Sequence, residues 1–213
     1  MKKLLFILIL GMVSVFAQNE KMIKAIEKNV AILDTARSIE TAKLLINNFE
    51  RIADVETGEW IAQYYAAVAN SAYSMREKDN VLKEKIIDKA EFYINRADSL
   101  NPNNSEIILI KSVIVYARIS ISPMERYLTM LPLATKYMAT ATELNPENPR
   151  VYLQSGLILL FTPEMMGGGK AKAKPVLLTA REKYEKFIPE SSIHPNWGRP
   201  HLAELLDYIE KPE

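Results

Sequence analysis

The sequence predicts an all-α protein, a stack of about four helix pairs that follows an N-terminal signal peptide. Two observations carry this prediction. Residues 89–104 can be laid over residues 133–148 at a constant offset of 44, with seven identical positions, and internal repeats of this length are typical of helical solenoids. In addition, no stretch alternates apolar and polar residues for long enough to indicate a β-strand.

Residues 1–17 have the pattern of a signal peptide. A basic start is followed by the apolar run 4–16, and Val15 and Ala17 have the spacing that signal peptidase reads, so we expect cleavage after Ala17. The run is shorter than the ~20 apolar residues that span a bilayer, and no cysteine follows it to receive a lipid. We therefore expect an exported protein, periplasmic or secreted and soluble, without a lipid anchor or an integral membrane segment after cleavage. Residues 18–213 would form one repeat domain.

The composition excludes several classes of function. The whole chain has 27 Lys and Arg against 26 Asp and Glu, and without Lys2 and Lys3 the mature chain has 25 basic against 26 acidic residues, a net charge of −1. Nucleic-acid binders depend on clustered positive charge, so we expect no nucleic-acid partner. The absence of cysteine excludes disulfides, thiolate metal sites and a cysteine nucleophile.

Helices can be placed in order along the mature chain. Upstream of the repeat, Ala42, Ile46 and Phe49 recur at helical spacing, and the stretch 59–67 is rich in alanine and aromatic residues. Downstream, alanine and leucine recur at helical spacing over 173–180. The predicted helices cover residues 20–36, 38–54, 58–75, 79–100, 105–119, 123–144, 149–161, 170–187 and 199–210.

The repeated segment predicts a helix with a small-residue face and a sharp end. Ala90 and Ala97 lie two turns apart, so one side of the helix lacks bulk and a neighbouring helix can approach closely. Asn101 precedes a proline, and the residue before proline is driven out of the α region, which ends the helix. The next helix begins at once, with Asn148 as its N-cap in the second copy and Ser105 as the cap in the first.

Residues 122–125 predict the start of a long helix. Ser122 and Glu125 have the spacing of a capping box, and a proline occupies the first helical position between them. Pro132 lies inside the same predicted helix. Because proline removes a backbone hydrogen bond there, we expect a kink.

This pattern resembles the tetratricopeptide repeat, a helix–turn–helix unit with two alanines seven apart on its second helix and a proline five residues later. Two sets of residues keep these intervals: Ala90, Ala97 and Pro102, then Ala134, Ala141 and Pro146. The unit repeats at 44 rather than 34 residues. The resemblance implies a right-handed α-α superhelix with a concave ligand-binding face. The order of motifs, segments 167–173 and 195–198 included, is also similar to small exported proteins of this type from Bacteroidetes bacteria, which implies export but no chemistry.

Four side chains on successive first helices are the candidates for contacts in the concave groove. They are Trp60, Tyr64, Ile108 and Tyr152. Trp60 and Tyr64 lie one turn apart on one helix face, and aromatic rings with a polar tip suit recognition surfaces. The alternative is that some of these rings belong to the inter-helix core. With this groove, the main functional prediction is an exported, non-enzymatic module that binds a partner protein or peptide.

The segment Gly167-Gly168-Gly169-Lys170 is a second candidate site. It precedes a predicted helix, and free N–H groups at a helix N-terminus attract anions. The pattern is not a P-loop, because Ala171 follows the lysine and no strand precedes the glycines. Two interpretations therefore stay open, a tight inter-helix turn or an anion site. An anion or ligand site here would make the protein a periplasmic small-molecule carrier or sensor.

Catalytic and metal-binding patterns are missing from the sequence. His194 and His201 are the two histidines, whereas a zinc site needs three or four ligands in a fixed geometry. The nucleophile motif Gly-x-Ser-x-Gly does not occur. We therefore predict neither a metal site nor a cofactor, and we expect the protein not to be an enzyme.

Overall fold

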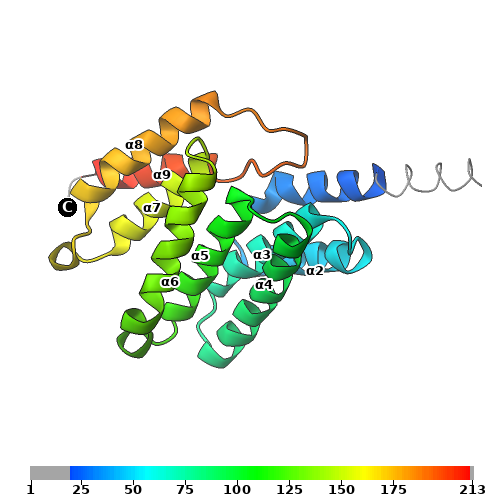
Figure 1. Cartoon of the computed structure of the whole chain (residues 1–213), viewed down its shortest axis with the longest axis horizontal. Coiled ribbons are helices and arrows are strands. Elements are labelled where there is room, and N and C mark those ends of the chain that lie inside the picture. Colours follow the sequence, from blue (N-terminus) through cyan, green and yellow to red (C-terminus); the bar gives the residue numbers. More distant parts are fainter. Residues whose placement is uncertain (1–19, 212–213) are drawn as a thin grey trace, which may run out of the picture.

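The fold is described from a computed structural model, which places residues 20–211. The expected signal peptide lies outside the described residues. This part of the chain is helical and contains no strand, which confirms the predicted all-α class (Figure 1). Within the described residues, the first helix covers 20–33. The helices that follow are α2 (Ile39–Val55), α3 (Trp60–Ser74), α4 (Asn80–Leu100), α5 (Ser105–Ile119), α6 (Pro123–Leu144), α7 (Pro149–Phe161), the short 3₁₀ helix η1 (Glu164–Met166), α8 (Lys170–Lys186) and α9 (Arg199–Glu210).

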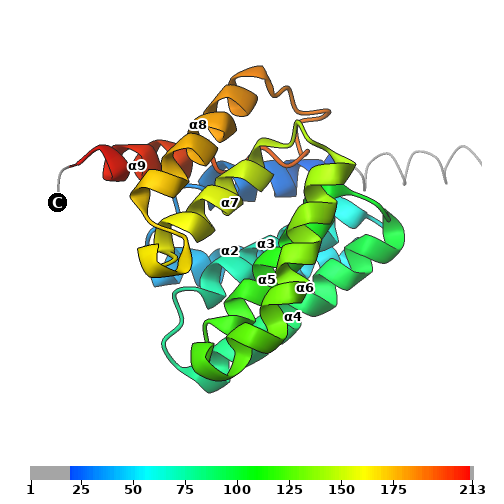
Figure 2. The same cartoon turned by 60° about the vertical axis from the view of Figure 1, so that its left-hand side comes forward.

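The helices pack as successive pairs. Helix α3 packs on α4, α5 on α6, and α7 on α8, and contacts between α4 and α5 and between α6 and α7 join each pair to the next. Figure 2 shows these pairs one after another, with α9 lying against α8. This arrangement is that of an α-α superhelix, as predicted. Within residues 20–211, no helix combines the length and the apolar composition needed to cross a membrane.

The alanines that define the repeat lie at helix contacts. Ala90 and Ala97 of α4 and Ala134 and Ala141 of α6 have no exposed surface. The alanines of α8 at the equivalent spacing are also fully buried. Because these side chains add no bulk, the neighbouring helix can lie close to the backbone. The small-residue faces therefore position the pairs relative to one another.

The predicted cap of α5 needs correction. The N-cap is Asn104, whose side chain accepts a hydrogen bond from the N–H two residues further on at 2.9 Å. Ser105 is the first helical residue and turns inward, where its hydroxyl donates to the carbonyl oxygen of Ala141 at 2.8 Å. Asn148 caps α7 as predicted. The serine therefore joins α5 to α6 and leaves the capping of its own helix to the asparagine.

The capping box predicted at the start of α6 does not form. Ser122 stands at the N-cap position, but its backbone lies outside the extended conformation usual for this position and its side chain makes no capping bond. Its hydroxyl donates instead to the carboxylate of Glu125 at 2.8 Å. Helix α6 runs without interruption through Pro132, so the proline is accommodated inside the helix.

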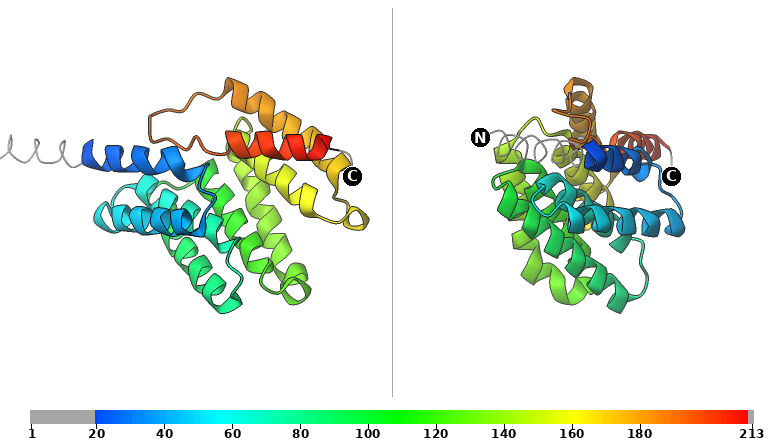
Figure 3. Two further views of the ribbon diagram at one scale, coloured as in Figure 1. Left: turned by 180° about the vertical axis from the view of Figure 1, so that it is seen from behind. Right: turned by 90° about the vertical axis from the view of Figure 1, so that its right-hand side faces the viewer.

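The segment between α8 and α9 joins the two ends of the described chain. We call residues 187–198 the C-terminal connection, and Figure 3 shows it running beside the first helix. The N–H of Gly198 donates to both carboxylate oxygens of Asp34, at 3.0 and 2.9 Å. The hydroxyl of Tyr65 on α3 donates to the carbonyl oxygen of Ile193 at 3.1 Å. The C-terminal part is thereby held against the N-terminal helices.

Candidate functional site

A buried ion pair joins two successive first helices of the superhelix. Glu106 lies in the first turn of α5 and Arg150 in the first turn of α7, 44 residues later. The arginine Nε donates to the two carboxylate oxygens at 2.9 and 2.8 Å, and Nη2 donates to one of them at 2.6 Å. Arg150 is 0% exposed and Glu106 is 5% exposed. The sequence analysis missed this pair, although opposite charges at equivalent repeat positions were a usable signal.

Aromatic side chains enclose the ion pair. The hydroxyl of Tyr64 donates to the Glu106 carboxylate at 3.0 Å, and the indole N–H of Trp197 donates to that hydroxyl at 2.9 Å. The ring of Phe187 lies over the Arg150 guanidinium, 4.5 Å from its central carbon. Within the described part of the chain, the arginine Nη1 is buried without a hydrogen-bond partner. The pair is thus sealed by rings from α3 and from the C-terminal connection.

The electrostatics of this cluster argue for a structural role. Burial raises the pKa of Tyr64 well above its ordinary value, and the negative charge of Glu106 raises it further. Burial lowers the pKa of Arg150, but the charge and the hydrogen bonds of Glu106 outweigh this effect and raise it overall. Tyr64 is therefore neutral and Arg150 charged across the ordinary pH range. General acid–base catalysis needs a group with a pKa near the working pH, so these two side chains hold the helices together.

Of the four residues predicted for the concave groove, Tyr64 lies in the core and the other three are half-buried. Trp60 and Tyr64 are in edge-to-face contact, with ring centroids 6.0 Å apart. Tyr64 has no exposed surface, which corrects the expectation that it reaches a partner, because its ring is part of the core. Ile108 and Tyr152 pack against the same small apolar cluster, and Trp60 and Tyr152 both pack against the main core. Tyr152 is also half-buried, with the ammonium of Lys183 4.9 Å from its ring centroid.

The C-terminal connection covers the part of α3 where a peptide was expected. Trp197 is hydrogen-bonded to Tyr64, and Ile193 to Tyr65. Trp197 is part of the main apolar core, and Ile193 packs against it. A peptide bound at this place would have to displace a segment of the chain itself.

The segment from Gly167 to Lys170 is a closed turn. The N–H groups of all three glycines donate to main-chain carbonyl oxygens within residues 159–164, at 2.9 to 3.2 Å. Gly167 and Gly169 have φ angles of 88° and 93°, which favour glycine. The Lys170 ammonium donates to the carbonyl oxygen of Lys211 at 3.3 Å. Because these N–H groups are already used, the geometry favours the tight-turn interpretation over an anion site.

The two histidines have different surroundings. His194 lies beside the ring of Phe187, with centroids 6.1 Å apart, whereas His201 lies in α9. Among residues 20–211, no three side chains of the types that bind metals are gathered in one place. Burial lowers the pKa of His201. Four charged side chains act on this histidine electrostatically: Glu204, Arg37, Asp34 and Arg76.

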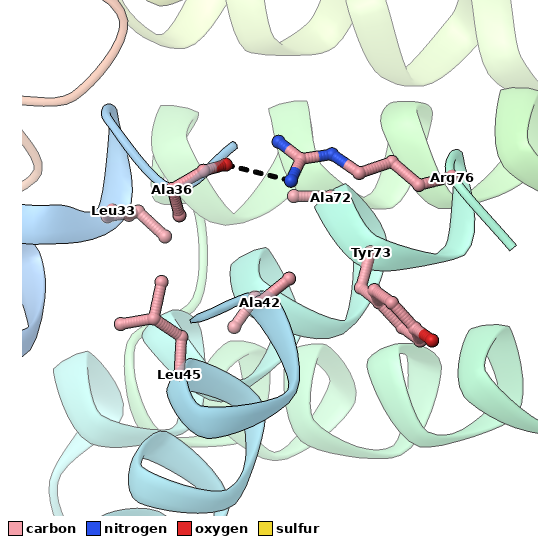
Figure 4. A pocket seen from close by; sticks show the side chains of 8 residues that line it. Leu33, Ala36, Ala42, Leu45, Ala72, Tyr73 and Arg76 are labelled. Atoms are coloured by element: carbon pink, nitrogen blue, oxygen red, sulfur yellow. Dashed lines mark hydrogen bonds between the residues drawn. The ribbon is translucent and has the colours of Figure 1, made fainter. Parts of the chain in front are cut away.

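A small apolar pocket opens between the end of the first helix, the start of α2 and the end of α3 (Figure 4). Its cavity volume is about 20 Å³, room for about one water molecule, and it is partly open to solvent. Apolar walls with few polar groups are typical of small-molecule sites. The sequence analysis did not predict this pocket, because its walls come from three separate elements. The lining residues are Leu33, Ala36, Ala42, Leu45, Ala69, Ala72, Tyr73 and Arg76.

Arg76 is the one charged residue of the lining. It follows the end of α3 and has an exposed side chain. Its Nη1 donates to the carbonyl oxygen of Ala36 across the pocket at 2.8 Å, as the dashed line in Figure 4 shows. His201 stands within electrostatic reach of Arg76. The pocket therefore combines an apolar wall with a cationic rim.

The fold defines an all-α protein of stacked helix pairs, with a small pocket between its N-terminal helices. No family model matches the chain, and no curated protein gives a significant match. A solved structure, the HusA haemophore from Porphyromonas gingivalis, is similar with a TM-score of 0.75 and 30% sequence identity, over 88% of this chain and 92% of the haemophore chain. At this identity and coverage, the chain belongs to the family of that haemophore. The tetratricopeptide resemblance extends to the packing of helix pairs and is not confirmed by a family model.

Proposed function

We propose that this protein is an exported, non-enzymatic carrier that binds haem or a related porphyrin. The observation that supports this function best is the similarity to a haemophore over most of both chains, at 30% sequence identity. The small pocket between the first helix, α2 and α3, with apolar side chains and a cationic rim, is the candidate place for the ligand. This function is a specific form of the small-molecule carrier predicted as the alternative to peptide binding, but the candidate pocket lies at residues 33–76 and not at the predicted segment from Gly167 to Lys170.

The chemistry of the pocket suits such a cargo. A porphyrin is a flat, largely apolar ring that carries carboxylates at one edge, so it needs an apolar wall and a nearby cation. The side chains of Leu33 and Leu45 supply apolar wall and Arg76 supplies the cation. As described, the cavity is about 20 Å³, room for about one water molecule and far below the ~300–1,000 Å³ of typical small-molecule sites. An edge of the ring could therefore enter only if the wall segment that contains Ala36 moved aside.

The arrangement of the concave face also favours a small molecule over a peptide. The C-terminal connection already occupies the surface of α3 near Tyr64 and Tyr65. A peptide would lose the hydrogen bonds that hold this connection, whereas a ligand in the pocket leaves them intact. The export predicted from residues 1–17 agrees with a carrier that works outside the cytoplasm, and it stays a prediction.

A titration of residues 18–213 with haemin, followed by the absorbance of the porphyrin, tests this function. We expect saturable binding, and we expect Ala72→Glu to abolish it, because Ala72 is an exposed lining residue and a longer acidic side chain would fill the pocket and repel carboxylates. The matched control is Ala139→Glu, at an exposed position of α6 outside the lining. The proposal fails if the wild-type protein does not bind haemin, or if both variants bind it equally well.

A further inference from the structure

Arg76 is held by a contact that a carboxylate could replace. Its guanidinium has five N–H donors, and the bond from Nη1 to the Ala36 carbonyl oxygen is the one hydrogen bond it makes within the described residues. The side chain is exposed, so its other donors face solvent at the rim of the pocket. The acceptor, Ala36, is a buried residue of the pocket wall.

Ala36 belongs to a short wall segment without helical structure. We call residues 34–38 the N-terminal connection, because they link the first helix to α2. Two ties fasten this connection to the C-terminal part. Asp34 accepts the N–H of Gly198, and Arg37 forms an ion pair with Glu204 of α9. Arg76 adds a third long-range tie, and this one lies at the pocket itself.

We propose that Arg76 is the residue that selects ligands with a free carboxylate, and that it does so by exchanging the Ala36 carbonyl for that carboxylate. The inference rests on the proposed porphyrin-carrier function. Hydrogen bonds between an arginine and a carboxylate are roughly twice as strong as those between neutral groups, and the planar guanidinium can form two of them side by side. A neutral carbonyl oxygen accepts one bond here, so the exchange favours the ligand.

The exchange has a consequence for the pocket wall. Once Arg76 leaves Ala36, the N-terminal connection keeps its ties at Asp34 and Arg37 but loses the contact that draws it over the pocket. The carbonyl of Ala36 can then turn toward water, which satisfies it at little cost. Binding of the carboxylate thereby widens a pocket that, with Ala36 in place, has room for about one water molecule. Arg76 would thus couple recognition of the ligand to its entry.

The test compares protoporphyrin IX with its dimethyl ester, both presented in the same non-ionic detergent. We expect the wild-type protein to bind the free acid more tightly by about tenfold or more, the value of one charged hydrogen-bonded contact. In Arg76→Gln this preference should disappear through weaker binding of the acid, with ester binding unchanged. Arg76→Lys should keep part of it, because the charge remains while the paired geometry is lost. Arg181→Gln, at an exposed arginine of α8, is the matched control.

Hydrogen exchange provides the second measurement. In Arg76→Gln without ligand, the amides of residues 34–38 should exchange faster than in the wild type, while those of α4 and α5 should not change. Persistence of the acid preference in Arg76→Gln, or unchanged exchange in this segment, overturns the inference. If neither porphyrin binds the wild-type protein, the carrier function itself fails. Equal binding of acid and ester leaves the carrier function standing and removes the role of Arg76.

Discussion

Glu106 and Arg150 occupy the same position in two successive helix pairs and form a fully enclosed ion pair, with three hydrogen bonds of 2.6 to 2.9 Å. Each of the two residues stands two positions after an asparagine cap, Asn104 or Asn148. The pair therefore joins α5 to α7 at the level of their caps. Tyr64 and Trp197 extend this contact to α3 and to the C-terminal connection, so one charged pair links four parts of the chain.

Removing the negative charge of this pair should destabilise the fold strongly. We expect Glu106→Gln to lower the free energy of unfolding by about 3 to 5 kcal/mol, because it leaves Arg150 buried without a counter-charge. The control is Glu147→Gln, which breaks a pair between Lys183 and a largely exposed carboxylate and should cost much less, because solvent screens that pair. Urea denaturation of the two variants measures both values. Similar losses in the two would mean that the buried pair is no more important than a surface pair.

The helices could be predicted from local signals. Proline after Asn101 and Asn145, the caps at Asn104 and Asn148, and the spacing of buried alanines each act within a few residues of the chain, so they are visible in the sequence. The error at Ser105 is of the same local kind. Asparagine and serine stand side by side, both can cap, and only the hydrogen bond to α6 decides which one turns inward.

The site could not be predicted in the same way. The aromatic residues at 60–65 suited a groove and a core equally well. They are covered in the structure because the C-terminal connection, more than 120 residues further along the chain, makes hydrogen bonds with Tyr64 and Tyr65. The pocket depends on packing between elements, because its lining comes from the first helix, α2, α3 and the residues that connect them, which meet only after folding. Charged residues at helix starts are usually solvated, so Glu106 and Arg150 gave no local sign of burial.

The helix contacts at the repeat alanines should not tolerate larger side chains. Ala97 and Ala141 have no exposed surface, so Ala97→Leu or Ala141→Leu should cost roughly 1 to 3 kcal/mol through overpacking. Ala139→Leu, on the exposed side of α6, is the control and should change stability by less than about 0.5 kcal/mol. Thermal or urea unfolding of the three variants checks this. Unchanged stability in the first two would contradict the assignment of these alanines to close helix contacts.

The glycine turn before α8 should respond to added bulk and not to anions. A Cβ at Gly168 would overlap the main-chain oxygens of Leu159 and Thr162, so we expect Gly168→Ala to destabilise by about 1 to 3 kcal/mol. Gly58→Ala is the matched control, because a Cβ there meets nothing within 4 Å. Adding phosphate should raise the unfolding midpoint of the wild type no more than that of Gly168→Ala. A phosphate effect confined to the wild type would restore the anion-site interpretation.

Stability should fall in mild acid because of His201. Burial lowers its pKa below the ordinary 6.5, so the unfolded chain takes up this proton before the folded protein does. The stability is therefore complete above about pH 6.5 and decreases as the pH falls from there toward the folded pKa. The charged groups that act on His201 come from three places: Glu204 on α9, Asp34 and Arg37 on the N-terminal connection, and Arg76 after α3.

The measurement is the free energy of unfolding by urea between about pH 8 and about pH 5.5, a range that limits the contribution of carboxyl groups. His201→Gln should show a smaller decrease over this range than the wild type. Burial also lowers the pKa of His194, so His194→Gln should remove a separate part of the decrease, and the double variant should remove more than either.

Because His201 lies within electrostatic reach of Arg37 and Arg76, its protonation adds a third cation near the pocket wall. We therefore expect the amides of residues 34–38 in the wild type to exchange faster as the pH falls over this range, once the intrinsic pH dependence of exchange is corrected for. His201→Gln should not show this acceleration. Identical pH profiles for His201→Gln and the wild type would mean that this histidine is not coupled to the stability of the N-terminal connection.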